Sequence, residues 1–388
     1  MSDENQAPPP PAAPAPLSGG PPAPHPAFEF LESAAGAPET FGPLEPAAPP
    51  PLPRAVLHSA LAIALLGLAA LLLGQVEAAL LIAIAALYFV AQAADVHPAM
   101  GRVYALLAWI PPVTGAILMG ALARLLVTNG PLTPLRIGAA ACSGLGALAS
   151  LITLLPPAAD RLVRLLFRGA GPSRTLRLTA SITFAILWVA LPAWLTFRDQ
   201  LAELLRDPGE LVSASKLSGG LVGYVVLAFA SVGFMVRRDA RGALERLGLT
   251  GLRPADGLTV IAGVVALWLF NLGTESFERH AFPALWASDQ GFTTALAGVM
   301  GPGLMLLLGL SAGIGEEITL RGALQPKLGI ALTSLLFAAL HVQYSWYGML
   351  SILVFGLILG VIRKRNSTTA AILVHALYDL LAMATSKT

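Results

Sequence analysis

The sequence has few charged residues and almost no cysteine. Only 12% of its 388 residues are Asp, Glu, Lys or Arg, about half the share that soluble globular domains carry. The single cysteine, Cys142, excludes a disulfide scaffold and a cysteine-rich metal site. The formal net charge of +2 comes without a long basic tract, so the chain has no electrostatic footprint for nucleic acid. These absences exclude a secreted enzyme, a DNA-binding factor and a soluble α/β domain.

The first 54 residues differ in composition from the rest. Residues 1–53 hold 17 of the 31 prolines, and much of the remainder is alanine. Without apolar periodicity such a segment cannot bury enough surface to offset its ordering entropy, so we expect a disordered Pro/Ala-rich tail over 1–54. The tail carries six acidic residues and no Lys or Arg before Arg54. It therefore lacks the basic start of a signal peptide, and we expect it to be retained in the cytoplasm.

Long apolar runs follow one another from Ala55 onward. The hydrophobic content of 56% and the mean hydropathy of +0.73 indicate a polytopic membrane protein embedded in the lipid bilayer. About 20 helical residues cross ~30 Å of hydrocarbon, so the runs predict an all-α bundle of eleven transmembrane helices. The predicted spans are 55–74, 77–94, 103–127, 136–156, 178–197, 219–236, 257–275, 295–318, 330–345, 348–362 and 368–385.

Basic residues concentrate in three of the predicted loops. Counted from a cytoplasmic N-terminus, all three loops fall on the cytoplasmic face, which predicts a protein of the inner (cytoplasmic) membrane. The segment 237–249 in the second loop fits either a short amphipathic surface helix or a solvated connector. The loop residues are Arg161, Arg164, Arg168, Arg174 and Arg177, then Arg237, Arg238, Arg241, Arg246 and Arg253, and finally Arg363, Lys364 and Arg365.

Ionisable residues within the spans gather in the last four. Such residues are costly in lipid and usually face a bundle interior or a water-filled cavity. Glu317 and Arg321 are four residues apart and can form an ion pair. Glu316 lies about 100° further round the helix, which leaves it without a local partner. His375 and Asp379 are also four apart and can present one polar patch.

A further histidine, His341, shares a helix face with Phe337, which gives it an apolar neighbour. At 1.5 Å per residue, His341 lies about 16 Å and His375 about 10 Å from the cytoplasmic ends of their spans. A tilted helix could bring Glu316 to the same depth. We therefore expect these residues to meet in the cytoplasmic half of the bilayer.

Three short patterns occur in order within 64 residues: Glu316–Arg321 reads EExxxR, Phe337–His341 reads FxxxH, and His375–Asp379 reads HxxxD. Together they resemble the motifs of the CAAX protease and bacteriocin-processing family of intramembrane proteases, which includes type II CAAX prenyl endopeptidases. The resemblance covers roughly residues 290–385. Some members, called myxosortases, are proposed to cleave C-terminal membrane-anchoring tails.

The resemblance implies a role for each motif residue. Glu316 and His341 would activate the attacking water, and His375 and Asp379 would stabilise the oxyanion of the tetrahedral intermediate. Prenyl-protein-processing members usually carry asparagine where this chain has Asp379. Because an ionised aspartate cannot donate a hydrogen bond, Asp379 would have to be protonated or would instead orient His375.

Glu317 and Arg321 would, by the same resemblance, hold the first motif in place.

Whether the site holds a metal is a separate question, because Glu316, His341 and His375 could together bind zinc and leave one position open for water. The HExxH pattern of zinc proteases is absent. The resemblance supports a glutamate-activated water equally well, and we expect no metal.

The sequence and the resemblance together predict an intramembrane endopeptidase, of metallo- or glutamic type. Its substrate would be a membrane-anchored or membrane-apposed protein or peptide, cleaved in a C-terminal tail or sorting signal. We expect 55–256 to form an N-terminal group of transmembrane helices and 257–388 to form the catalytic core.

Two other functions fit the polar residues less well. Intramembrane glutamates and histidines also occur in ion-coupled transporters, but here they cluster in one third of the chain. A non-catalytic membrane scaffold would not need every motif residue intact.

Asn271 and Glu275, four residues apart in the seventh span, form a polar pair that is either structural or lines a substrate cavity.

Overall fold

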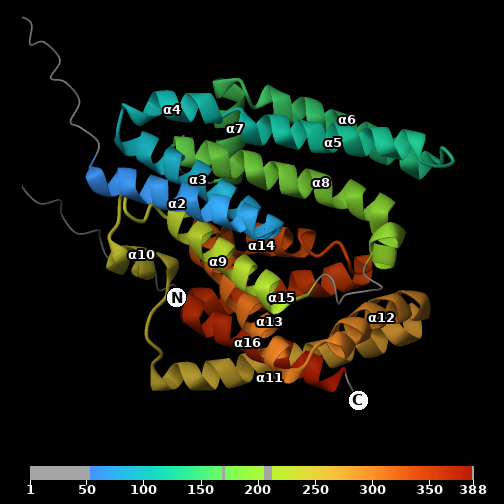
Figure 1. Ribbon diagram of the computed structural model, residues 1–388. Coiled ribbons are helices and arrows are strands. Elements are labelled where there is room, and N and C mark those ends of the chain that lie inside the picture. The colour runs from blue at the N-terminus through green and yellow to red at the C-terminus, as the bar shows by residue number, and fades with distance from the viewer. Residues whose placement is uncertain (1–52, 168–170, 205–211, 387–388) are drawn as a thin grey trace, which may run out of the picture. The chain divides into compact units, whose positions relative to one another are not determined.

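The computed structural model describes residues 53–167, 171–204 and 212–386, which form one compact unit (Figure 1). Nearly all of the expected tail, 1–54, lies outside the described residues. Every regular element in the described part is a helix, as predicted. The helices are α2 (Arg54–Leu72), α3 (Val76–Val96), α4 (Met100–Leu107), α5 (Ile110–Thr128), α6 (Pro134–Ile152), α7 (Pro156–Leu166), α8 (Arg174–Leu204), α9 (Ala214–Ser231), α10 (Ala240–Leu247), α11 (Pro254–Ala281), α12 (Pro283–Val299), α13 (Pro302–Glu316), η1 (Glu317–Leu324), α14 (Gln325–Ala339), α15 (Trp346–Arg365) and α16 (Thr368–Thr385).

The chain is a multi-pass membrane protein. Ten helical segments of the described chain are long and apolar enough to cross a bilayer, one fewer than the eleven predicted. The difference lies in the predicted spans 295–318 and 330–345. The helix that begins at Pro302 continues through η1 into α14, so that 302–339 forms one segment. The predicted span ends at residue 318 because charged residues lie there, but Glu317 and Arg321 are paired inside the bundle and the helix does not stop there.

Gly329 turns the chain back on itself within this segment. Its backbone has φ +80° and ψ 171°, a region open almost only to glycine. Arg321 and Phe337 would be about 24 Å apart along a straight helix. Instead, the Arg321 guanidinium carbon lies 5.2 Å from the centre of the Phe337 ring. Residues 330–339 therefore run back alongside η1, and they are too few to cross a bilayer alone.

Two pairs of glycines let the last helices approach closely. A Cβ atom at Gly313 would lie 2.9 Å from the Cβ of Ala376, and one at Gly309 would lie 3.1 Å from the Ala376 carbonyl. Gly356 and Gly360 of α15 pack in the same way against residues 330–337 of α14. Small residues spaced four apart are a common way for membrane helices to pack. They bring α13 against α16 and α14 against α15.

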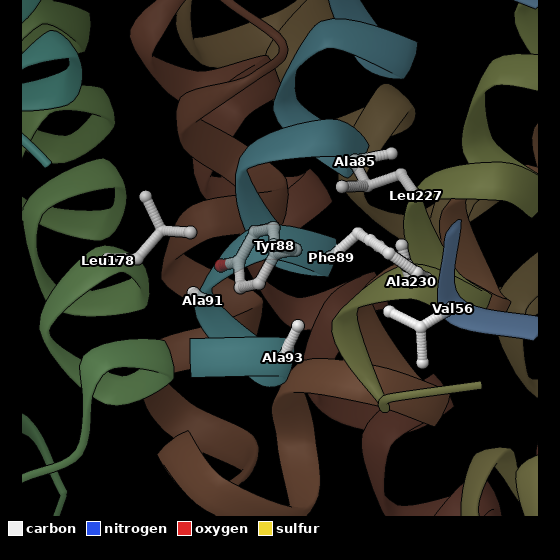
Figure 2. Close-up of a cluster of buried hydrophobic side chains, with 9 residues drawn as sticks. All are labelled: Val56, Ala85, Tyr88, Phe89, Ala91, Ala93, Leu178, Leu227 and Ala230. Atoms are coloured by element: carbon white, nitrogen blue, oxygen red, sulfur yellow. The ribbon is translucent and has the colours of Figure 1, made fainter. Parts of the chain in front are cut away.

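The helices before residue 232 support this core. Figure 2 shows a buried cluster in which α3 contributes Ala85, Tyr88 and Phe89 between Leu178 of α8 and Leu227 of α9. The helix α9 packs against α3 and also against α13. The N-terminal helices thus hold α9 in place as the wall against which α13 rests.

The segment 237–249 contains a helix, which decides between the two alternatives left by its sequence. The side chain of Asp239 caps the start of α10, and Gly248 ends it with φ +72°. Leu247 is fully buried, and Arg246 donates a hydrogen bond of 3.0 Å to the Gly322 carbonyl of η1. The helix is therefore anchored to the element that carries the first motif.

Candidate active site

The first motif lies where α13 passes into η1, a stretch of π-helix. Such stretches are rare and often occur at functional sites. The side chains of Glu317 and Arg321 are fully buried, with Arg321 Nε 3.3 Å from Glu317 Oε2. The ion pair predicted from their spacing is thus present. The Arg321 guanidinium also rests on the Phe337 ring as a cation–π contact.

The other oxygen of Glu317 contacts the third motif. Glu317 Oε1 lies 3.1 Å from His375 Nδ1 on α16. Sequence spacing predicts only the pairing with Arg321 and does not reveal this contact. The sequence nonetheless contains a signal for this contact. Gly309, Gly313 and Glu317 follow one another at intervals of four residues, so the glycine face that meets α16 continues to the glutamate.

Phe337 is the point at which the three motifs meet. Its ring centre lies 4.7 Å from that of His341 and 5.8 Å from that of His375, nearly perpendicular to the latter at 87°. His341 Nδ1 is 2.7 Å from the Phe337 carbonyl oxygen. Because a carbonyl only accepts, Nδ1 carries the proton, and Nε2 of a neutral His341 is left as an acceptor.

His375 is flanked by a carboxylate at each ring nitrogen. Its Nε2 lies 3.5 Å from Oδ2 of Asp379, the neighbour predicted from the HxxxD spacing. This distance is longer than an ordinary N–H···O hydrogen bond. Glu317 therefore holds the ring firmly at Nδ1, while Nε2 is held more loosely.

All four residues to which the resemblance gives catalytic roles line one cavity of about 790 Å³. Glu316 Oε2 is buried there and has no hydrogen-bond partner among the described residues. Asn271 and Glu275 line the same cavity. The Asn271 amide lies 3.5 Å from Glu275 Oε2, and Gln290 donates to the other carboxylate oxygen.

The loop after α14 is held by two acidic residues that the sequence did not single out. Asp289 of α12 accepts a 2.8 Å hydrogen bond from the Ser345 backbone, and Glu278 of α11 lies 3.2 Å from the Ser345 hydroxyl. In the same loop, Tyr344 stacks on His341 with ring centres 6.5 Å apart. The α11–α12 pair thus fixes the loop that carries His341. Both acids lie in polar stretches of the sequence, beside Arg279 and Gln290, so nothing in the sequence marks them out.

The cavity extends away from the basic loops. The helix α16 begins at Thr368, whose N–H donates to the Gly248 carbonyl after α10, and it continues to Thr385. His375 lies seven residues along it, about 10 Å at the helical rise. From there the cavity lining continues to Ser386, just beyond the opposite end of α16.

The geometry does not fit the zinc site considered for Glu316, His341 and His375. No group of three His, Cys, Asp or Glu side chains in the described part of the chain could hold a metal ion. Both nitrogens of His375 already face carboxylates. The arrangement of these three side chains therefore does not suit a metal ion.

Comparison with known proteins connects this site to one family. Residues 298–381 match the family model described as type II CAAX prenyl endopeptidase Rce1-like. The match contains all three motifs, so the resemblance is confirmed over this segment. No curated protein and no solved structure matches the chain.

Proposed function

We propose that this chain, with its Rce1-like segment, is an intramembrane endopeptidase. It hydrolyses a peptide bond in a membrane-anchored or membrane-apposed protein or peptide. The observation that carries the proposal is that Glu316, His341, His375 and Asp379 line one cavity within the matched segment. That family relation supports protease activity more specifically than transport or scaffolding.

The attacking water is held between Glu316 and His341. Glu316 Oε2 is buried without a hydrogen-bond partner among the described residues, so it is available to accept a proton from water. His341 donates through Nδ1 to its own helix, which leaves Nε2 for the same water. The water oxygen attacks the scissile carbonyl carbon, and its proton passes through the carboxylate to the leaving amine.

The developing oxyanion is stabilised by His375. Glu317 fixes the ring through Nδ1, so the Nε2–H group can be directed at the substrate oxygen. One such hydrogen-bond donor stabilises the transition state by about 3–4 kcal/mol. The 3.5 Å separation supports Asp379 as the residue that orients His375 rather than as a donor of its own.

The substrate enters from the face opposite the basic loops. Short basic loops remain in the cytoplasm, which supports an inner-membrane protein with a cytoplasmic N-terminus. The cavity continues from His375 toward Ser386, away from those loops. This arrangement suits a C-terminal tail or sorting signal that reaches the site from within the bilayer, as proposed for myxosortases.

The test compares peptide termini in membrane and secreted proteins from cells that express wild type or Glu316→Gln. Mass spectrometry should find precursors that accumulate only in the variant and a shared truncation site in wild type. Glu245→Gln is the matched control, because Glu245 lies on the exposed face of α10, outside the cavity. Identical termini in wild type and Glu316→Gln, at equal protein levels, would contradict proteolysis and favour transport or scaffolding.

A further inference from the structure

A second cavity of about 360 Å³ lies at the basic ends of the helices, apart from the active site. It is formed where the end of α3, the start of α8, the segment before α10, α10 itself and the start of α14 come together. Four basic side chains line it: Arg237, Arg238, Arg246 and Lys327. Asp95 is the one acidic residue among its lining residues.

The basic side chains are only partly neutralised by the protein. Arg237 pairs with Asp95 at 3.1 Å. Arg238 and Arg246 donate to backbone carbonyls, which hold the guanidinium groups in place but leave their charge uncompensated. Lys327 makes no hydrogen bond or ion pair within the described chain, and the Asp95 carboxylate acts on it only through its charge. The four cationic side chains and the one carboxylate give the lining of the cavity a net charge of +3.

These charges also act on one another. Burial, followed by the neighbouring charges of Arg238 and Arg363, lowers the pKa of Arg246 from its ordinary value. An arginine nevertheless remains protonated, so the repulsion among the cations persists in the folded protein. An anion bound between them would relieve it.

The position and the walls of the cavity define the kind of anion. The Arg174 backbone donates to Asp95 at 2.8 Å, and the Gln92 amide donates to the Ser231 carbonyl, so the ends of α3, α8 and α9 meet there. These are ends of membrane-crossing helices, at the level where lipid headgroups lie. Apolar side chains, including Phe167 and Val232, line the cavity beside the cations. A charged group attached to an apolar body fits such walls better than a free ion.

We propose that this cavity binds the phosphate headgroup of an anionic phospholipid. Basic pockets between transmembrane helices on the cytoplasmic side are suited to such headgroups. The bound lipid would bridge α3, α8, α10 and α14. It would also lie next to η1, whose Gly322 and Ala323 carbonyls accept from Arg246.

The test uses the full chain, purified in detergent and freed of bound lipid, with native mass spectrometry as the readout of lipid binding. The probes are phosphatidylglycerol, zwitterionic phosphatidylcholine and inorganic phosphate. Wild type should bind phosphatidylglycerol most tightly. Lys327→Gln should bind it about five-fold more weakly, as expected for the loss of about 1 kcal/mol per basic residue. Lys327→Arg should restore binding, which separates loss of charge from misfolding.

Lys364→Gln is the matched control. It removes the same charge from an exposed lysine near the end of α15, outside the cavity lining, and should leave phosphatidylglycerol binding at the wild-type level. Equal weakening by both glutamine variants would show diffuse attraction to the basic surface and overturn the site. Inorganic phosphate that displaces the lipid at equal concentration would overturn the lipid assignment in favour of a soluble anion.

Discussion

His375 Nδ1 lies 3.1 Å from Oε1 of Glu317, although 58 residues separate the two in sequence. The second glutamate of the first motif therefore does more than pair with Arg321, because its two oxygens join two of the three motifs. The first glutamate, Glu316, lies in the active-site cavity with one oxygen unpartnered among the described residues. Two adjacent and chemically identical side chains thus have different surroundings.

This difference predicts that substitution of Glu317 mainly lowers stability, whereas substitution of Glu316 mainly lowers activity. Glu317→Gln should lower the free energy of unfolding by about 3–5 kcal/mol, because it leaves the fully buried Arg321 charge without its partner. Glu316→Gln should abolish proteolysis while leaving stability nearly unchanged, because no hydrogen bond to its Oε2 is lost. Thermal unfolding and cleavage assays on both variants measure the two effects. Equal stability loss in the two variants would contradict this division of roles.

The contact between α13 and α16 predicts that a larger residue at Gly313 displaces His375. A Cβ there would lie 2.9 Å from Ala376, so Gly313→Leu must push the helices apart. We expect a loss of about 1–3 kcal/mol in stability, as for other overpacked cores, together with a loss of cleavage activity. Gly303→Leu on the same helix is the control, since a Cβ at Gly303 meets no atom within 4 Å. A Gly313→Leu protein with wild-type cleavage would show that this close approach does not position the site.

The reversal of the chain at Gly329 predicts a cost for any side chain there. Its backbone conformation, φ +80° and ψ 171°, is strained for other residues by about 1–3 kcal/mol. Gly329→Ala should therefore lower the unfolding temperature. Gly120→Ala in α5, where a Cβ meets open space, should leave it equal or slightly higher because alanine favours helix. Equal unfolding temperatures for the two alanine variants would contradict a strained turn at Gly329.

The position of Asp379 beside His375 predicts a graded loss of cleavage activity among variants at this residue. Its Oδ2 lies 3.5 Å from His375 Nε2, longer than an ordinary hydrogen bond, so in the proposed mechanism this oxygen orients the ring loosely from the Nε2 side. Asp379→Asn keeps an oxygen that can accept, whereas Asp379→Ala removes it. We therefore expect cleavage rates to fall from wild type to Asn to Ala, with each variant folded to the same extent. An Asn variant as inactive as the Ala variant would show that the negative charge itself is required.

Local spacing was sufficient to predict most helices and the pairs that lie four residues apart. It predicted the contact of Glu317 with Arg321 and that of His375 with Asp379, because both depend only on helical geometry. It could not predict the contact of Glu317 with His375, which depends on how closely α13 and α16 pack. The hydropathy pattern also ended a span at residue 318, because hydropathy counts charges and cannot tell whether they are paired.

The two acidic contacts to the loop that carries His341 show the same limit. Asp289 and Glu278 converge on Ser345 from two other helices. The two acids are eleven residues apart in sequence, and only the packing of α11 and α12 against the loop brings them together. Contacts between distant elements therefore had to come from the structure.

The central claim, that Glu316 activates water to cleave a peptide bond in the membrane, is tested most directly with water enriched in oxygen-18. Membranes containing wild type, Glu316→Gln or Glu245→Gln are incubated in this water, and the C-termini of membrane proteins are analysed by mass spectrometry. Wild type and Glu245→Gln should both produce new C-termini that carry one heavy oxygen atom, and Glu316→Gln should produce none. The same labelled C-termini in Glu316→Gln membranes, or none with wild type, would contradict the account.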